Sequence, residues 1–217
     1  MSRVRAKICG LKDPLSLKTA IEGGASHVGL VFFPPSPRSV TPEEAAELVE
    51  GIPSGISVVG LFVDPDDELL KAAITSADLD LLQLHGDESP ERVADIREQF
   101  GIPVMKALKI AAPQDLEAVA KYEPVSDMLL FDAKAPKDLK NALPGGNGLV
   151  FDWRMLTNME LSVPWMLAGG LDRDNITEAV TISGATLVDT SSGVEEKPGV
   201  KDPRKIADFL AVVNAIK

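Results

Sequence analysis

The feature that most constrains the fold of this chain is a regular alternation of apolar runs and amphipathic stretches along its length. Eight short apolar runs predict strands, and the stretches between them have helical periodicity. Several runs, such as VGLVFF and SVVGLFV, are apolar without interruption, which is typical of parallel strands buried on both faces. The expected strands are Val4–Cys9, Val28–Phe33, Val58–Val63, Asp80–Leu84, Val104–Leu108, Met128–Phe131, Trp165–Ala168 and Leu187–Asp189.

The stretches between these strands carry recognisable helix starts. TPEEAAELVE has Thr41 as its N-cap, Pro42 at the first helical position and acids in the first turn, and SPERVADIREQF and DPRKIADFLAVVNAI follow the same rule. Eight strand–helix pairs in 217 residues predict an α/β fold with a closed (β/α)8 barrel (a TIM barrel), as a single domain over residues 1–217. The rival is a doubly wound open sheet, but no GxGxxG turn follows the first strand.

Charge and composition exclude several kinds of partner. The chain has 33 acidic against 22 basic residues, a net charge of −11, which disfavours nucleic acid and anionic membrane surfaces as partners. No apolar run approaches the roughly 18 to 20 residues that a membrane span needs. A single cysteine excludes an intrachain disulfide and fits a cytoplasmic location. Barrels of this size occur as monomers and as homodimers, so the oligomeric state stays open.

In a barrel of this kind the chemistry lies where the strands end, and polar residues at those positions are few. Cys9, Arg38, His85, Asp132 and Asp189 each stand at or just past the end of an expected strand. A lone cysteine is more often an inert apolar residue, Asp132 could simply cap its loop, and a loop arginine is usually solvated. The strand-end position of Cys9 and the matching position of Asp132 favour a catalytic Cys9. For Asp132 itself the two alternatives are evenly balanced, and the functional alternative for Arg38 is a ligand for a carboxylate.

Two further features concern the barrel interior and the anion site. Lys7 alternates with Cys9 on one strand face, so we expect it to point into the barrel and to pair with a carboxylate such as Asp189. Glycine turns follow the seventh and eighth strands, where barrels commonly bind phosphate through backbone N–H groups. The residues expected to bind phosphate are Gly169, Gly170, Ser192 and Gly193.

The remaining polar residues and the longest loop complete the sequence predictions. The stretch from Ala133 to Gly148 is too long for a simple connector and predicts a mobile active-site loop. Its cluster Gly145–Gly148 is interpreted as a hinge or as a source of further donors. His27 stands at the opposite end of its strand and is expected to be structural. No His, Cys or acidic residues have metal-ligand spacing, so no metal is expected.

Taken together, these motifs resemble the phosphoribosylanthranilate isomerase family of tryptophan biosynthesis. The resemblance covers the chain in order through KICGL, GLVFFPPSPRSV, VGLFV, QLHGDE, ALKI, LLFDA, GGNGLVFDW, LAGGL and VDTSSGVEEKPGVKD. It implies an Amadori rearrangement of N-(5'-phosphoribosyl)anthranilate to 1-(2-carboxyphenylamino)-1-deoxyribulose 5-phosphate without a cofactor. The loop AKAPKDLKNALPGGNG is longer and richer in lysine than the pattern associated with the family.

The resemblance also implies roles for individual residues. Cys9, as a thiolate, would be the general base, which requires nearby positive charge, and Asp132 would be the general acid, kept protonated by desolvation. Arg38 would bind the anthranilate carboxylate, and the glycine turns would bind the phosphate. From the residues themselves, His85 is either a structural histidine or a polar wall of the site. Asp189 would contact either the sugar or Lys7.

Two other functions compete with this interpretation. A related phosphosugar isomerase or epimerase, such as the aminoaldose isomerase of histidine biosynthesis, would carry a carboxylate where this chain has Cys9, and that substrate has two phosphates. A non-catalytic phosphosugar-binding barrel would have no use for Cys9 together with Asp132.

Overall fold

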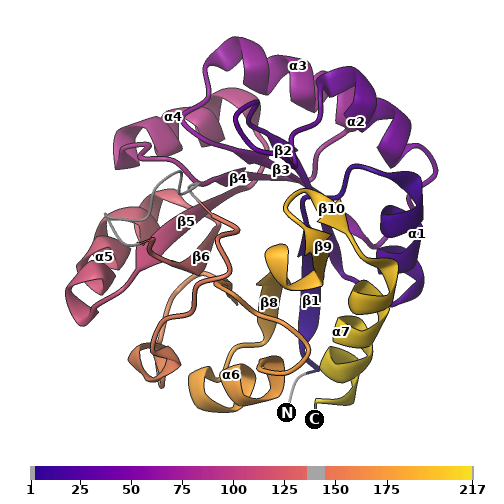
Figure 1. Ribbon diagram of the computed structural model, residues 1–217. Helices are drawn as coiled ribbons and strands as arrows, with labels where there is room; N and C mark the ends of the chain where they lie inside the picture. The colour runs from indigo at the N-terminus through magenta and orange to yellow at the C-terminus, as the bar shows by residue number, and fades with distance from the viewer. Residues whose placement is uncertain (1–2, 136–144, 217) are drawn as a thin grey trace.

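The computed structural model of the protein describes residues 3–135 and 145–216. Eight parallel strands form a closed barrel in the order β1 to β8, and β8 pairs with β1 to close it (Figure 1). The prediction of a (β/α)8 barrel is therefore confirmed. The strands are β1 (Arg5–Cys9), β2 (His27–Phe32), β3 (Ser57–Phe62), β4 (Leu81–Leu84), β5 (Val104–Ile110), β6 (Met128–Ala133), β7 (Trp165–Leu167) and β8 (Leu187–Thr190).

Helices surround the barrel, and most start at the capping residues that the sequence predicts. Thr41 forms a complete capping box with Glu44, and Ser89 and Asp202 accept hydrogen bonds from the first turns of their helices. The α-helices are α1 (Pro14–Glu22), α2 (Pro42–Val49), α3 (Asp67–Ala77), α4 (Pro90–Phe100), α5 (Val119–Tyr122), α6 (Ile176–Ser183) and α7 (Pro203–Ala215).

The expectation of a full helix after every strand is wrong at two places. After β5 the four-residue α5 lies between two 3-10 segments, η1 (Pro113–Ala118) and η2 (Glu123–Val125). Pro124 cannot donate a backbone hydrogen bond and helps to end this helix. After β6 the described residues contain only the 3-10 turn η3 (Trp153–Leu156), which is followed by Asn158 with a left-handed φ of 59°.

Three strands, β5, β6 and β8, extend beyond their predicted carboxyl ends, and the extensions of β6 and β8 change how the site residues are held. β6 continues through Asp132 and Ala133, which pair with Lys109 and Ile110 of β5. β8 continues to Thr190, which pairs with Ile8 of β1. Asp132 is therefore fixed within the sheet rather than carried by a loop.

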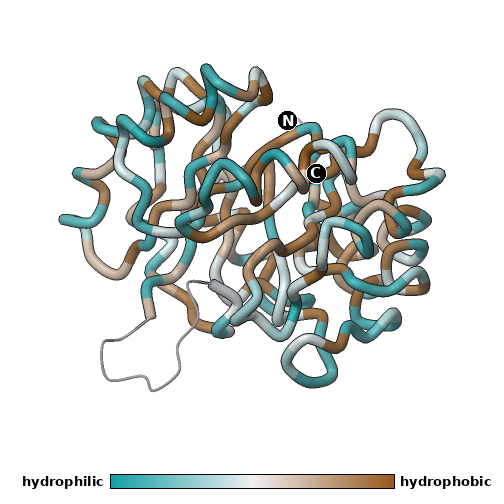
Figure 2. The backbone as a smooth tube through the Cα atoms, turned by 90° about the horizontal axis from the view of Figure 1, so that it is seen from above, coloured by the Kyte–Doolittle hydropathy of each residue, from teal (hydrophilic) through white to brown (hydrophobic). Residues whose placement is uncertain are grey.

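Two layers of apolar side chains form the core. The larger layer lies between the strands and the helices, and a smaller cluster fills the barrel interior. Figure 2 shows hydrophobic segments running through the interior and hydrophilic ones gathered on the outer loops and helices. No helix in the described part of the chain is long and apolar enough to cross a membrane. The interior cluster contains Val59, Leu81, Met105, Ala107, Leu130, Met166, Ala168 and Leu187.

One element lies outside the barrel sheet. Between β8 and α7 the chain forms the short 3-10 turn η4 (Ser192–Val194) and then an antiparallel hairpin of β9 (Glu195–Lys197) and β10 (Val200–Lys201). The backbone of Asp202, which caps α7, donates a hydrogen bond to Val194 O at 2.9 Å. The hairpin is thus anchored at the carboxyl end of the barrel, beside the last strand.

Candidate active site

A cavity of about 640 Å3, its open mouth included, lies at the carboxyl ends of the strands. Apolar side chains such as Val31, Phe33 and Leu61 form part of its wall. Among its lining residues are eight that the sequence predicted for the site: Cys9, Arg38, His85, Asp132, Gly169, Gly170, Asp189 and Ser192.

Cys9 ends β1 and is 2% exposed. Burial raises the pKa of its thiol, while the positive charge of Lys7 opposes the rise and Asp189 adds to it. The positive charge expected beside Cys9 is therefore present, but its effect on the thiol pKa does not outweigh that of burial. Gly29 of β2 leaves room for this arrangement, because a Cβ there would lie 3.0 Å from the sulfur and 3.1 Å from Lys7 Cε.

Lys7 points into the barrel, as its alternation with Cys9 predicts. Its ammonium is fully buried and lies 2.9 Å from Asp189 Oδ1. Burial lowers the pKa of Lys7, but Asp189 and then Cys9 raise it, and the net shift is upward. The predicted pairing of Lys7 with Asp189 is confirmed, and Asp189 also lines the cavity.

Asp132 lies across the mouth of the cavity from β1 and is 6% exposed. Its Oδ2 lies 3.1 Å from His85 Nε2, and its Oδ1 accepts a hydrogen bond from Ala133 N at 2.8 Å. The bond to Ala133 joins adjacent residues and is not the Asx turn of the loop-cap alternative, because Lys134 N donates to Ile110 O instead. Asp132 also lines the cavity, as a catalytic role requires. Gln83 Nε2 lies 3.1 Å from His85 Nδ1, so both ring nitrogens of His85 have a partner and the orientation of the ring is fixed.

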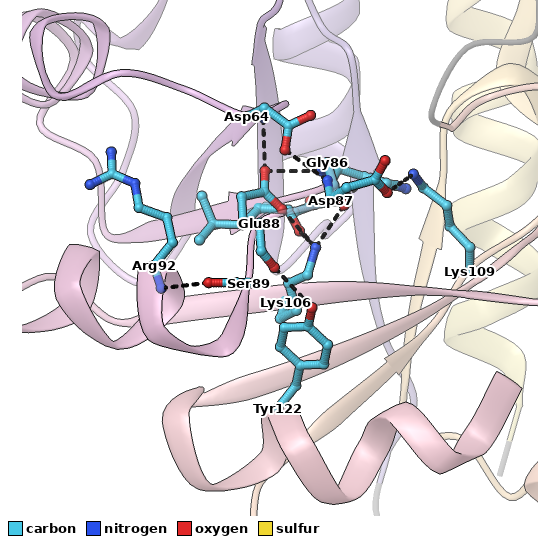
Figure 3. A network of polar contacts seen from close by, with 12 residues as sticks. Asp64, Gly86, Asp87, Glu88, Ser89, Arg92, Lys106, Lys109 and Tyr122 are labelled. Carbon is cyan, nitrogen blue, oxygen red and sulfur yellow. Dashed lines mark hydrogen bonds and ion pairs between the residues drawn. The ribbon is translucent and has the colours of Figure 1, made fainter.

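A buried network that sequence reasoning missed holds the loop after His85 (Figure 3). Lys106 Nζ donates to Glu88 Oε2 at 2.7 Å and to Gly86 O at 2.9 Å. Glu88 Oε1 accepts from Gly86 N at 3.0 Å and from Asp64 N at 2.9 Å. The network ties the ends of β3, β4 and β5 together. In the sequence, the acid of this network is Glu88, the last residue of the QLHGDE motif.

Arg38 is 5% exposed, which excludes the alternative of a solvated loop arginine. Its Nε and Nη2 donate to the two carboxylate oxygens of Glu195 at 2.7 and 2.8 Å. Nη2 also donates to Gly146 O at 3.1 Å. Glu195 is part of the SSGVE motif, but its type and position alone did not indicate this contact.

The glycine turns are placed as an anion site requires. Gly169 and Gly170 have φ values of 89° and 59°, which favour glycine, and both line the cavity. In the described part of the chain their N–H groups donate to no protein acceptor. Gly193 does not line the cavity. A Cβ at Gly193 would collide with the carbonyl oxygen of Leu171, so close packing accounts for this glycine.

The loop predicted to be mobile lies mostly outside the described residues, which resume at Gly145. A Cβ at Gly145 would lie 2.8 Å from His85 Cε1 and 2.9 Å from Asp132 Oδ2, so this segment closely covers the candidate acid. Gly145 and Gly146 both line the cavity. Gly146 accepts a bond from Arg38 rather than donating one, and Gly145 packs closely over the site.

The comparison with protein families decides what kind of site this is. Residues 6–212 match the model of the family described as N-(5'phosphoribosyl)anthranilate (PRA) isomerase. The chain belongs to this family.

Relatives of the phosphoribosylanthranilate isomerase family match over nearly their whole lengths. The chain is 56% identical to an N-(5'-phosphoribosyl)anthranilate isomerase of Rhodospirillum centenum, over 98% of this chain and 99% of that protein. A second such isomerase, from Paramagnetospirillum magneticum, is 57% identical over 95% of both chains. Nearly full coverage at this identity places the whole barrel, and not only its motifs, in the family.

Solved structures of family members have the same fold. The isomerase of Thermotoga maritima superposes with a TM-score of 0.85 at 32% identity, covering 97% of this chain and 98% of that one. Another solved isomerase, with a TM-score of 0.82 and 30% identity over 97% and 98% of the two chains, is a complex with reduced 1-(o-carboxyphenylamino)-1-deoxyribulose 5-phosphate.

One histidine singled out in the sequence, His27, does not line the isomerase cavity. His27 is 8% exposed at the start of β2, where its Nδ1 lies 2.8 Å from Ser26 Oγ. Burial, followed by the charges of Lys7 and Arg5, lowers the pKa of His27 to about 4. Among the described residues, no group of three or more His, Cys, Asp and Glu side chains is arranged to hold a metal ion.

Proposed function

We propose that this cavity catalyses the reaction for which its family is named, with Cys9 as general base and Asp132 as general acid. The substrate is N-(5'-phosphoribosyl)anthranilate and the product is 1-(2-carboxyphenylamino)-1-deoxyribulose 5-phosphate. The reaction moves protons and breaks one C–O bond, so it needs no redox partner. An acid and a base on opposite sides of the sugar are sufficient.

The chemical steps assign one proton transfer to each residue. Asp132 donates its proton to the furanose ring oxygen while the anilino nitrogen lone pair expels that oxygen from C1, giving an open-chain protonated Schiff base. The thiolate of Cys9 then removes the proton from C2, and those electrons form the C1–C2 double bond of an enolamine. Loss of the enol proton and protonation of C1 give the ketone product.

The observation that carries this proposal is that Cys9 and Asp132, from β1 and β6, line one cavity whose wall also contains Arg38 and the glycine turns. Strands one and six lie on different sides of the barrel, so the two groups can face opposite sides of a bound sugar. Burial raises the pKa of the Cys9 thiol, and the Lys7 ammonium is the positive charge available to stabilise its thiolate.

Substrate binding is assigned to the remaining residues of the cavity. Arg38 binds the anthranilate carboxylate, and the backbone N–H groups of Gly169 and Gly170 with the Ser192 hydroxyl bind the phosphate. His85 orients Asp132 through the contact between Nε2 and Oδ2. Asp189 keeps Lys7 charged with one oxygen and reaches the sugar from the cavity wall.

Substitutions of the acid and the base test the proposal directly. Cys9→Ala and Asp132→Asn should each lower kcat by about 10²- to 10⁴-fold, because each removes one positioned proton transfer. Binding of the product, measured by titration, should change little. The assay follows loss of the fluorescence of the anthranilate substrate, and Asp174→Asn on the exposed surface is the control for a carboxyl-to-amide change. Near-normal turnover by either variant would contradict the assigned role.

The cellular setting and the oligomeric state belong to the same proposal. The chain is proposed to act in the cytoplasm, where a single free cysteine stays reduced. One solved relative is described as monomers generated from a dimeric isomerase of Thermotoga maritima. For this chain, a monomer or a homodimer remains a prediction that sedimentation measurements can decide.

A further inference from the structure

The hairpin of β9 and β10 is not needed to close the barrel, yet it carries the partner of a proposed substrate-binding residue. Glu195, the first residue of the hairpin, is 6% exposed and holds the Nε and Nη2 groups of Arg38 in a two-pronged ion pair at 2.7 and 2.8 Å. Such paired bonds fix the plane of a guanidinium group as well as its position. Glu195 therefore determines which way Arg38 faces.

Packing around Arg38 reinforces this orientation. A Cβ at Gly10 would lie 2.8 Å from Arg38 Cδ, so the first loop presses on the aliphatic part of the side chain. Gly199, in the turn of the hairpin, packs so closely against Pro37 that a Cβ would collide with the carbonyl oxygen of Pro37. The hairpin thus contacts the loop of Arg38 at two neighbouring residues.

Glu195 also holds a second buried cation. Lys201, on the partner strand of the hairpin, donates to Glu195 Oε1 at 2.9 Å. The same ammonium donates to Ser191 O at 2.9 Å and to Ser191 Oγ at 3.1 Å, beside the proposed phosphate loop. One carboxylate therefore links the two places where the anionic groups of the substrate are proposed to bind.

The charges of this cluster do not cancel. Arg38 and Lys201 contribute two positive charges and Glu195 one negative charge, so the buried cluster carries a net charge of +1 in a chain whose total is −11. Within the described residues the Nη1 group of Arg38 donates no hydrogen bond. Glu195 occupies one edge of the guanidinium. Gly146 packs beside the other end, where a Cβ would lie 2.8 Å from Nη1, and the hydrogen-bonding capacity of Nη1 is not used by the described residues.

We propose that Glu195 is a positioning residue that sets the specificity of the isomerase for a carboxylated aromatic ring by holding Arg38 in its binding orientation. The inference rests on the proposed contact between Arg38 and the substrate carboxylate. Glu195 does not touch the reacting atoms. Its effect appears in the binding of substrates that carry the carboxylate and not in the proton transfers.

Glu195→Gln is the informative substitution because it keeps the shape of the side chain. The carboxylate accepts three hydrogen bonds from Arg38 and Lys201, two of them at Oε1 and one at Oε2. An amide presents one oxygen and one NH2 group, so in either orientation a donor faces a donor. Both cations also lose the negative charge that they share, and Arg38 is no longer fixed.

The experiment compares two substrates, N-(5'-phosphoribosyl)anthranilate and N-(5'-phosphoribosyl)aniline, which lacks the carboxylate. Glu195→Gln should raise KM for the carboxylated substrate on the order of 10- to 100-fold, with kcat changed little, the range expected for one charge-assisted contact. KM for the aniline compound should change by less than about threefold, since its binding does not use Arg38. Turnover of the aniline compound also shows that the variant is folded.

Two further variants complete the test. Glu196→Gln makes the same charge change at the exposed neighbouring position of the hairpin and should leave both KM values unchanged. Glu195→Asp keeps the charge but draws it back by one methylene, and it should lose only part of the preference for the carboxylated substrate. If Glu195→Gln does not fold, the loss of preference in Glu195→Asp carries the test.

The possible results separate the two proposals. If the unsubstituted enzyme shows no preference for the carboxylated substrate, the contact assigned to Arg38 is wrong. If the enzyme has that preference and both Glu195 variants keep it in full, the role of Glu195 is overturned. An equal rise of KM for both substrates indicates general damage to the site and also overturns the role proposed for Glu195.

Discussion

The buried ion pair between Lys7 and Asp189 gives a quantitative test of how the barrel interior is stabilised. Lys7 is fully buried, the Asp189 side chain is 10% exposed, and their charged atoms lie 2.9 Å apart. Replacing Asp189 by Asn leaves a buried ammonium without its counter-charge. Loss of one partner of a buried pair typically costs about 3 to 5 kcal/mol.

The free-energy cost of deprotonating Lys7 sets an upper limit on this loss of stability. The unpaired lysine can escape its penalty by releasing a proton, which at pH 7 costs about 1.36 kcal/mol for each of the roughly 3.4 units below its ordinary pKa, or about 4.6 kcal/mol. The expected loss for Asp189→Asn is therefore about 3 to 4.6 kcal/mol. For a chain of this size, roughly 2 to 4 °C per kcal/mol gives a fall in Tm of about 6 to 18 °C.

The assay is thermal unfolding, with Asp208→Asn as the matched control. Arg173 and Asp208 form an ion pair of 2.5 Å whose side chains are 55% and 51% exposed, so the same substitution there should cost less than about 1 kcal/mol. The two variants differ in burial and not in the chemistry of the change. A fall in Tm for Asp189→Asn no larger than that of the control would refute the reasoning.

The pH dependence gives a second check with a defined sign. In the native protein the pKa of Lys7 is raised, so its contribution to stability is present below the ordinary lysine pKa and is lost as pH rises through the folded value. In Asp189→Asn, burial acts on Lys7 without the opposing charge of Asp189, and Cys9 is the other titratable group that raises the Lys7 pKa. The lysine pKa then falls, so the variant gains stability as pH rises toward about 10.4. The stability gap between the two proteins should narrow above neutral pH, and a constant gap would contradict the assignment.

Three further predictions concern single side chains. Lys7→Met should raise the pH midpoint for alkylation of Cys9 by iodoacetamide, because Lys7 holds the thiol pKa down; the single cysteine makes the readout specific, and an unchanged midpoint would exclude this effect. His27, with a pKa lowered to about 4, should make the fold less stable as pH falls from about 6.5 to 4, by up to roughly 3 kcal/mol, since the unfolded chain takes up the proton first. Denaturant titrations of His27→Gln should show a weaker pH dependence in that window, and equal slopes would argue against it. Arg38→Ala should raise KM more than it lowers kcat, and steady-state kinetics that show the reverse would place Arg38 in the chemical steps.

The sequence alone determined the fold class, because eight buried apolar runs separated by capped amphipathic stretches leave few arrangements other than a closed barrel. Period-two alternation also sufficed to place Lys7 inside the barrel beside Cys9. The strand-end rule located most of the cavity, since strand ends in a parallel barrel meet at one face. These features are local or periodic, and such information is present in the order of residues.

Apart from the pair of Lys7 with Asp189, only the tertiary structure decided the partners of the buried charged side chains. Arg38 meets Glu195 across 157 positions of sequence, and Lys106 meets Glu88 across 18, contacts that neither periodicity nor spacing encodes. It also decided that Gly193 serves packing and that burial outweighs Lys7 at the Cys9 thiol. Each of these outcomes depends on distance and on exclusion of water, which arise only when segments distant in the chain are brought together.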